Sequence, residues 1–170
     1  MKDTSLRQLV LSALLAAMTC VATMVIQIPS PMNGYVNLGD CVVLLSGWLL
    51  GPWYGLAAAG IGSMLADLFA GYAHYAVGTF LIKGVMAAVA GLICRSAWGE
   101  KHQMAARGIG GVAAECIMVW GYFAFAALWL GNGWAAAASI PGNLIQGGFG
   151  LAGGVLLGTA LQRVHLPQTK

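Results

Sequence analysis

The sequence contains very few charged residues. Of its 170 residues only 8% are charged, whereas 59% are hydrophobic, and the mean hydropathy is +0.80. Soluble domains carry about a quarter charged residues, so a fold with this composition cannot cover its surface in water, and lipid must surround most of it. Binding to nucleic acid is also excluded, because the net charge of +3 comes from scattered residues and no basic patch exists.

The sequence also lacks the motifs of common catalytic and ATP-binding sites. It has no G-x-x-x-x-G-K-[ST] loop for the phosphates of ATP, no H-E-x-x-H zinc motif and no nucleophile-elbow serine. Its four cysteines are isolated, with no C-x-x-C pair. We therefore expect a protein that is not an enzyme and that holds neither a metal nor a cofactor.

Long apolar stretches dominate what is present. A membrane-spanning helix needs roughly 20 mainly apolar residues. The pattern predicts one all-α domain over residues 1–170, an integral membrane bundle of six transmembrane helices. The expected spans cover about residues 6–28, 38–50, 53–69, 78–94, 107–130 and 140–161. Spans two and three are short for a bilayer, so the Gly51-Pro52 break between them can lie inside the protein.

The basic residues indicate how the bundle is oriented. Seven of the eight lysines and arginines lie before the first span, around the loop between spans four and five, or after the last span: Lys2, Arg7, Arg95, Lys101, Arg107, Arg163 and Lys170. Cytoplasmic loops of membrane proteins are enriched in these residues. Both termini and the 95–107 loop are therefore expected in the cytoplasm.

The eighth basic residue, Lys83, lies inside a predicted span. A charge near the bilayer centre costs roughly 2.5–3.5 kcal/mol even on a lenient insertion scale. Lys83 should therefore face the bundle interior and pair with a carboxylate. Asp40 and Asp67 both lie toward the outer ends of their spans, and the sequence leaves open which of them is the partner.

Further polar residues gather toward the same outer side. Carboxylates, amides, phenols and an ammonium group that converge from several helices are typical of a small-molecule pocket. The candidate ligand-binding residues are Asn37, Asp40, Asp67, Tyr72, Lys83, Glu115, Tyr122, Asn143 and Gln146. The alternative is a polar cluster that only fixes the register of the helices. For Glu115, which lies deeper, a ligand contact at the pocket floor and a neutral structural role both remain open.

Several motifs together resemble the S component of energy-coupling factor (ECF) transporters. They are Y-V-N-L-G-D at 35–40, L-G-P at 50–52, G-I-G-S-M-L-A-D-L at 60–68, T-F-L-I-K-G at 79–84, E-C-I-M-V-W-G-Y-F at 115–123 and I-P-G-N-L-I-Q-G at 140–147. The resemblance covers nearly the whole chain. It implies a six-helix protein of a prokaryotic cytoplasmic membrane that captures a vitamin or a vitamin precursor outside the cell.

The resemblance also implies partners and a lid. S components dock on a transmembrane coupling subunit driven by two cytoplasmic ATPases. Ala13 and Ala17 match the A-x-x-x-A docking motif of the first helix, and the loop over residues 29–38 is expected to act as the lid. The mixed polar site favours a pyridoxine-like or hydroxymethylpyrimidine-like ligand, and it leaves riboflavin, thiamine, niacin and pantothenate open. The alternatives are a standalone carrier and a structural membrane protein without ligand.

Overall fold

The computed structural model describes residues 2–30 and 34–163, and this part of the chain folds into seven α-helices and one hairpin. The helices are α1 (Lys2–Val25), α2 (Asp40–Leu50), α3 (Pro52–Phe69), α4 (Ala76–Cys94), α5 (Ala97–Lys101), α6 (Gln103–Ala124) and α7 (Ile140–Arg163). A π-helix (Phe125–Trp129) continues α6, and a 3₁₀ helix (Gly133–Ser139) leads into α7. Six of the seven α-helices correspond to the six predicted spans.

Four helical stretches of the described chain are long and apolar enough to cross a membrane. They are Ser5–Val25, Ala76–Cys94, Gln103–Trp129 and Gly133–Leu161, while Asp40–Leu50 is a shorter apolar helix. The prediction of a membrane bundle is confirmed at this level. The short helix α5 was not predicted; the Gly99 N–H donates to Ser96 Oγ at its start, over 3.0 Å.

The purely helical prediction missed a β-hairpin. Strands β1 (Gln27–Ser30) and β2 (Gly34–Asn37) pair antiparallel, with Gln27 opposite Asn37 and Ser30 opposite Gly34. Each strand has four residues, which is the lower limit at which an alternating pattern can be recognised in a sequence. The predicted lid loop is therefore largely a hairpin; its residues 31–33 lie outside the described part.

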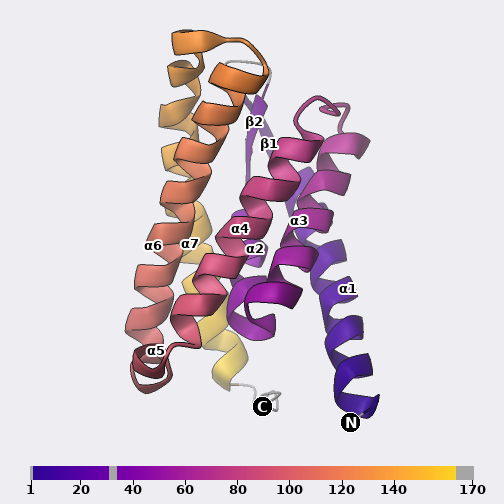
Figure 1. Cartoon of the computed structure of the whole chain (residues 1–170), viewed down its shortest axis with the longest axis vertical. Helices are drawn as coiled ribbons and strands as arrows, with labels where there is room; N and C mark the ends of the chain where they lie inside the picture. Colours follow the sequence, from indigo (N-terminus) through magenta and orange to yellow (C-terminus); the bar gives the residue numbers. More distant parts are fainter. Residues whose placement is uncertain (1, 31–33, 164–170) are drawn as a thin grey trace.

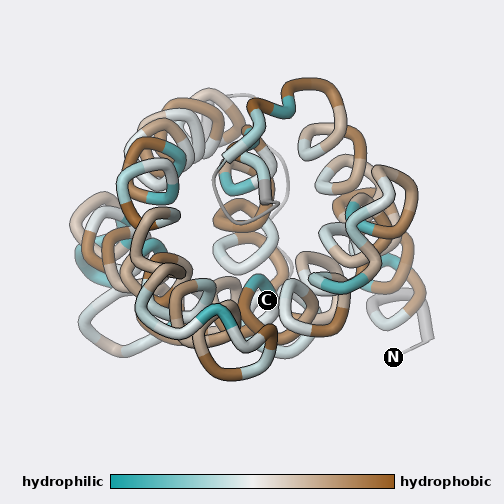
Figure 2. The backbone as a smooth tube through the Cα atoms, turned by 90° about the horizontal axis from the view of Figure 1, so that it is seen from above, coloured by the Kyte–Doolittle hydropathy of each residue, from teal (hydrophilic) through white to brown (hydrophobic). Residues whose placement is uncertain are grey.

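Helix α2 forms the centre of the bundle. It contacts α1, α3, α4, α6 and α7, and Figure 2 shows these helices arranged around a middle that α2 and the hairpin occupy. Eleven residues give α2 a length of about 16 Å, roughly half the hydrocarbon thickness of a bilayer. The hairpin lies above α2, at the end of the molecule opposite the start of α1 (Figure 1). We call these two ends the hairpin end and the termini end.

Close apolar packing fills the bundle toward the termini end. Leu44, Met86 and Met118 are fully buried around α2. The indole of Trp48 lies against α7 because that helix has glycines there: a methyl group at Gly154 would lie 3.4 Å from Trp48 Cη2. The half of the centre that α2 occupies is therefore a tightly packed helical core.

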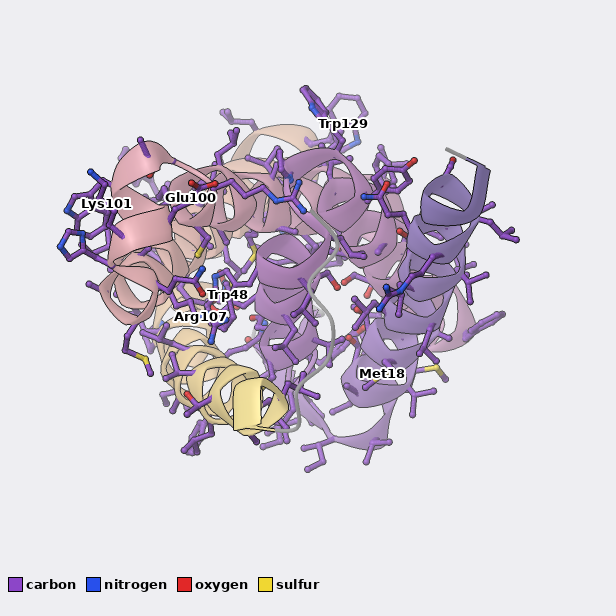
Figure 3. All side chains as sticks on the ribbon, turned by 90° about the horizontal axis from the view of Figure 1, so that it is seen from below. Met18, Trp48, Glu100, Lys101, Arg107 and Trp129 are labelled. Carbon is purple, nitrogen blue, oxygen red and sulfur yellow. The ribbon has the colours of Figure 1, made fainter. Side chains whose placement is uncertain are left out.

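Arg107 differs from its predicted position at the edge of a cytoplasmic loop. Helix α6 begins at Gln103, about one turn earlier than expected, so Arg107 is its fifth residue and is only 6% exposed. Its guanidinium lies 5.8 Å from the centre of the Trp48 ring. Figure 3 shows both side chains pointing into the bundle, whereas Lys101 points away from it. Stacking on an aromatic face explains how this cation is accommodated inside.

The Gly51-Pro52 break lies inside the protein, as the short spans predicted. Gly51 is buried and has φ of 80°, a left-handed conformation that favours glycine. A methyl group there would lie 2.1 Å from Arg95 Cζ. Pro52 then starts α3, where its missing N–H costs no hydrogen bond. This turn allows two short helices to meet below the surface of the bundle.

Candidate functional site

A cavity of about 50 Å³ lies at the hairpin end, between the hairpin and the helices around it. Its walls come from α1, the hairpin, α3, α4, α6, the 3₁₀ helix and α7. The lining residues are Thr23, Ser30, Tyr35, Asn37, Ser63, Asp67, Tyr75, Thr79, Lys83, Tyr122, Ser139, Asn143 and Gln146. All of them are hydroxyl, amide, carboxylate or ammonium side chains, so the cavity combines polar groups with the apolar parts of the same side chains.

An ion pair forms one wall of the cavity. Lys83 on α4 donates to one carboxylate oxygen of Asp40 on α2. Gln146 on α7 donates from Nε2 to the other oxygen, over 2.7 Å. Asp40 is fully buried and Lys83 is 2% exposed. The partner of Lys83, which the sequence left open, is therefore Asp40; removing either charge would leave the other unpaired in a low-dielectric interior.

The same wall extends into the hairpin. The backbone N–H of Asn37 donates to Gln146 Oε1 over 2.9 Å, and the N–H of Gly39 donates to Asn37 Oδ1 over 2.8 Å. We call Lys83, Asp40, Gln146 and Asn37 the Lys83 network. It joins α2, α4 and α7 to β2, and so it fixes the hairpin over the bundle.

The opposite wall is carried by α3. Asp67 accepts a hydrogen bond at Oδ1 from the phenol of Tyr35 on β2, over 2.6 Å. Burial raises the pKa of Tyr35, and the Asp67 carboxylate raises it further, so the phenol remains a donor. The ring of Tyr72 lies 4.7 Å from that of Tyr35. One helical turn before Asp67, Ser63 faces the same cavity; we call these two α3 residues the Ser63–Asp67 wall.

Aromatic rings close a third side. Tyr122 on α6 donates its hydroxyl to Thr79 Oγ1 over 3.0 Å, and Lys83 Nζ lies 5.4 Å from the centre of its ring. Tyr75 lies 6.2 Å from Tyr122 between ring centres. Aromatic faces next to a few oriented polar groups suit a flat, polar ring as ligand.

The structure brings together most of the residues that the sequence singled out. Six of the nine candidates line the cavity: Asn37, Asp67, Lys83, Tyr122, Asn143 and Gln146. Asp40 lies behind Lys83 and Gln146, and Tyr72 lies behind Tyr35. Whether any of them binds ligand stays a prediction, but their convergence was correctly anticipated.

Glu115, for which the sequence left a ligand contact and a structural role open, lies outside the cavity lining. It is 7% exposed and packs against glycines of α7: methyl groups at Gly147 and Gly150 would lie 3.2 Å from its Cβ and 2.9 Å from its Oε1. A methyl group at Gly150 would also lie 2.6 Å from Asp40 Cβ. Glu115 is thus next to Asp40 but does not line the cavity.

Seven lining residues were not among the candidate ligand-binding residues: Thr23, Ser30, Tyr35, Ser63, Tyr75, Thr79 and Ser139. All seven are neutral serine, threonine or tyrosine residues, which are common in apolar helices and turns, and six of them carry no signal by themselves. One signal was present for Ser63, because it precedes Asp67 by four residues and such pairs share a helix face.

Two further predictions concern metal ions and docking. In the described part of the chain, no group of three or more histidine, cysteine, aspartate or glutamate side chains could hold a metal ion. Ala13 and Ala17 are both exposed on α1. Their surface is therefore accessible to another helix.

Comparison with known proteins identifies the family. A model of the family described as "ECF-type riboflavin transporter, S component" matches residues 3–163. The chain belongs to this family. It is thus the S component of an ECF transporter, a membrane transport subunit and not an enzyme.

Two further proteins are similar to this chain. A protein of Pyrococcus woesei, described as "Uncharacterized protein in gap 3'region", is 34% identical over 138 residues, which cover 76% of this chain and 90% of that protein. A solved structure titled "Structure and mechanism of the S component of a bacterial ECF transporter" superposes with a TM-score of 0.71 at 21% identity, covering 94% of this chain and 98% of the other. At this identity the second similarity establishes the S-component fold.

Proposed function

We propose that this S component captures a compact, one-ring, hydroxylated nitrogen heterocycle in the cavity at its hairpin end. A pyridoxine-like or hydroxymethylpyrimidine-like compound fits this description. The observation that supports the proposal is the cavity itself, which has a volume of about 50 Å³ and walls of hydroxyls, amides and tyrosine rings. Polar groups of this kind offer hydrogen bonds to ring nitrogens and hydroxymethyl groups, and tyrosine rings offer flat contact surfaces.

Riboflavin is the second candidate, because the description of the matching family names it. Its three fused rings and sugar-alcohol chain need far more space than a single ring, so the cavity of about 50 Å³ would have to widen much more for riboflavin than for a one-ring compound. Binding of riboflavin would therefore require the hairpin to move away from α3, which breaks the hydrogen bond between Tyr35 and Asp67. Ligand size is the property that separates the two candidates.

The proposal includes an orientation and a set of partners. The positive-inside rule places the termini end in the cytoplasm, so the hairpin end takes ligand from outside. Delivery then requires a transmembrane coupling subunit and two cytoplasmic ATPases. A shallow, open apolar surface supports helix docking on α1; it is formed by Ala17, Met18, Val21, Ala22 and Val42, and Ala13 lies outside it. Figure 3 shows Met18 pointing outward from this helix.

The ligand is tested by thermal unfolding of the detergent-purified chain with pyridoxine, hydroxymethylpyrimidine, thiamine, riboflavin, niacin and pantothenate. A ligand at a hundred times its dissociation constant adds about 2.7 kcal/mol to stability when only the folded state binds it. We expect a one-ring, hydroxylated compound to give the largest shift. If the protein is folded and no compound shifts its unfolding temperature, the capture proposal is wrong.

Docking is tested with Ala17→Trp in cells that contain the complete transporter. A bulky ring on α1 should block close helix contact, so uptake is expected to fall at least about tenfold, whereas ligand binding by the purified chain stays unchanged. Ala152→Trp on the exposed side of α7 is the matched control and should not reduce uptake. ATP-independent uptake by the purified chain in liposomes would instead support a standalone carrier.

A further inference from the structure

Ser63 differs from other buried or partly buried hydroxyl residues on the helices of this bundle. Ser12, Thr19, Ser46 and Thr159 each donate to the backbone carbonyl four residues earlier, over 2.7–2.8 Å. This local bond satisfies a hydroxyl in an apolar helix. Ser63 is 1% exposed, yet its Oγ has no hydrogen-bond partner in the described structure. Its hydroxyl therefore remains unpaired at the cavity wall.

A second unpaired atom lies one helical turn later on the same face of α3. Asp67 is 4% exposed, and its Oδ1 accepts from Tyr35, but its Oδ2 has no hydrogen-bond partner among the described residues. The hydroxyl of Thr79, which accepts from Tyr122, also interacts with this carboxylate, although Oδ2 itself meets no partner at a full hydrogen-bonding distance and angle. An unpaired buried acceptor is energetically unfavourable until something donates to it.

The charges around the cavity leave the Asp67 carboxylate without a dedicated cation. Lys83 is already paired with Asp40, whose second oxygen is bonded to Gln146. His74 also lies near Asp67, but it is an exposed residue of the outer turn. Among the residues that the structure describes, the cavity walls thus carry one ion pair and the Asp67 carboxylate, while Glu115 is buried next to Asp40 outside the lining.

We propose that Ser63 and Asp67 determine ligand specificity by binding a hydrogen-bond donor of the ligand and by excluding anionic ligands. The donor is a ring N–H, an amino group or a hydroxymethyl group that reaches Asp67 Oδ2 and Ser63 Oγ together. A carboxylate or phosphate on the ligand would bring a second negative charge next to Asp67, where little water screens the repulsion. This inference depends on the proposed capture function and adds that the ligand is neutral or cationic.

The test measures binding to the full-length chain in detergent by isothermal titration calorimetry. Pyridoxine and pyridoxine 5′-phosphate are the matched probes, because they share one ring and differ by the anionic group; hydroxymethylpyrimidine, riboflavin and pantothenate complete the set. We expect the neutral one-ring probe that binds best to bind at least about a hundredfold tighter than the anionic probes. Loss of a hydrogen bond to a charged group reduces affinity by about tenfold to a hundredfold, and we expect this for Asp67→Asn with that probe.

Matched variants separate the two α3 residues from general effects. Ser63→Ala should weaken binding of the same probe about fivefold or more, because it removes one hydrogen bond. Ser46→Ala makes the same chemical change at a buried serine that already bonds to Val42, and Glu100→Gln removes a carboxylate from exposed helix α5. Neither control should alter affinity by more than about twofold.

Each outcome decides between the inference and the function on which it rests. If a neutral probe binds equally well to wild type, Asp67→Asn and Ser63→Ala, the inference is wrong and the capture function stands. Tighter binding of pantothenate or of the phosphate ester overturns the charge selection while capture still holds. If no probe binds to the folded chain, both the capture proposal and this inference fail.

Discussion

The Lys83 network and the Ser63–Asp67 wall face the same cavity and differ in how far their polar atoms are paired. In the network, both oxygens of Asp40 accept hydrogen bonds, one from Lys83 and one from Gln146. In the wall, Ser63 Oγ and Asp67 Oδ2 have no hydrogen-bond partner in the described structure. Paired groups buried in a membrane protein hold helices together, whereas unpaired groups at a cavity are available to a ligand. The hydrogen-bonding state therefore separates structural polar residues such as Asp40 from candidate ligand-binding residues such as Asp67, which the sequence alone does not distinguish.

The largest loss of stability is expected when one charge of the Lys83 network is removed. Lys83→Met leaves Asp40 buried without its cation, which should lower the free energy of unfolding by about 3–5 kcal/mol. The double variant Lys83→Met, Asp40→Leu should recover most of that loss, because no uncompensated charge remains at position 40, although Gln146 Nε2 then loses its acceptor. Denaturant unfolding in detergent measures both. A double variant as unstable as the single one would show that the ion pair is not what couples these helices.

A smaller effect is expected where α7 approaches the network. Gly150→Ala introduces a methyl group 2.6 Å from Asp40 Cβ. Overpacking of this kind destabilises by about 1–3 kcal/mol. Gly148→Ala on the same helix is the control, since nothing lies within 4 Å of a methyl group there. Equal unfolding temperatures for the two variants would contradict the close contact between α2 and α7.

Tyr35 joins the hairpin to the Ser63–Asp67 wall, and Tyr35→Phe tests this link. We expect the loss of about 1–2 kcal/mol of stability and faster release of bound ligand, measured by stopped flow. Tyr54→Phe on α3 is the control. Because the pKa of Tyr35 is raised, the contribution of its hydrogen bond is fully present below the ordinary tyrosine pKa of about 10. It should decline as pH rises above that value, and a pH-independent difference between wild type and Tyr35→Phe would argue against this bond.

The smallest expected effect gives the clearest contrast between paired and unpaired hydroxyls. Ser46→Ala removes a buried hydroxyl that donates to Val42 and should lower stability by about 1 kcal/mol. Ser63→Ala removes one that is unpaired and should leave the stability of the ligand-free protein unchanged or raise it. Thermal unfolding without ligand measures both variants. A similar loss for each would mean that Ser63 is satisfied within the protein.

Much of the fold could be predicted from the sequence, because a helix that crosses a lipid bilayer must be long and mainly apolar. Apolar stretches predicted six helices, and α7 begins at Ile140, as the sequence indicated. The hairpin was not accessible, because strands of four residues leave too short a pattern. The burial of Arg107 was missed for a different reason: a basic residue near a predicted span end is normally assigned to the loop, and its contact with Trp48 is a tertiary feature.

The candidate site was predictable in location but not in detail. The sequence placed Lys83 near two carboxylates, and the choice of Asp40 depends on the face that α2 presents. That face is fixed by close contacts such as the one between Asp40 and Gly150, which a sequence does not show. The unpaired state of Ser63 and Asp67 is likewise a property of three-dimensional neighbours, so it could only be found in the structure.

Helix α2 spans only about half of the bilayer thickness, so the packed core and the cavity occupy different halves of the bundle. The tightly packed centre belongs to α2, whereas much of the wall of the cavity belongs to the hairpin and to α3. If the proposed capture function is right, substitutions in the Ser63–Asp67 wall can alter what is taken up without disturbing the packing on which folding depends. One scaffold of this construction is suited to give rise to importers for different cargoes, each inheriting the same stable half.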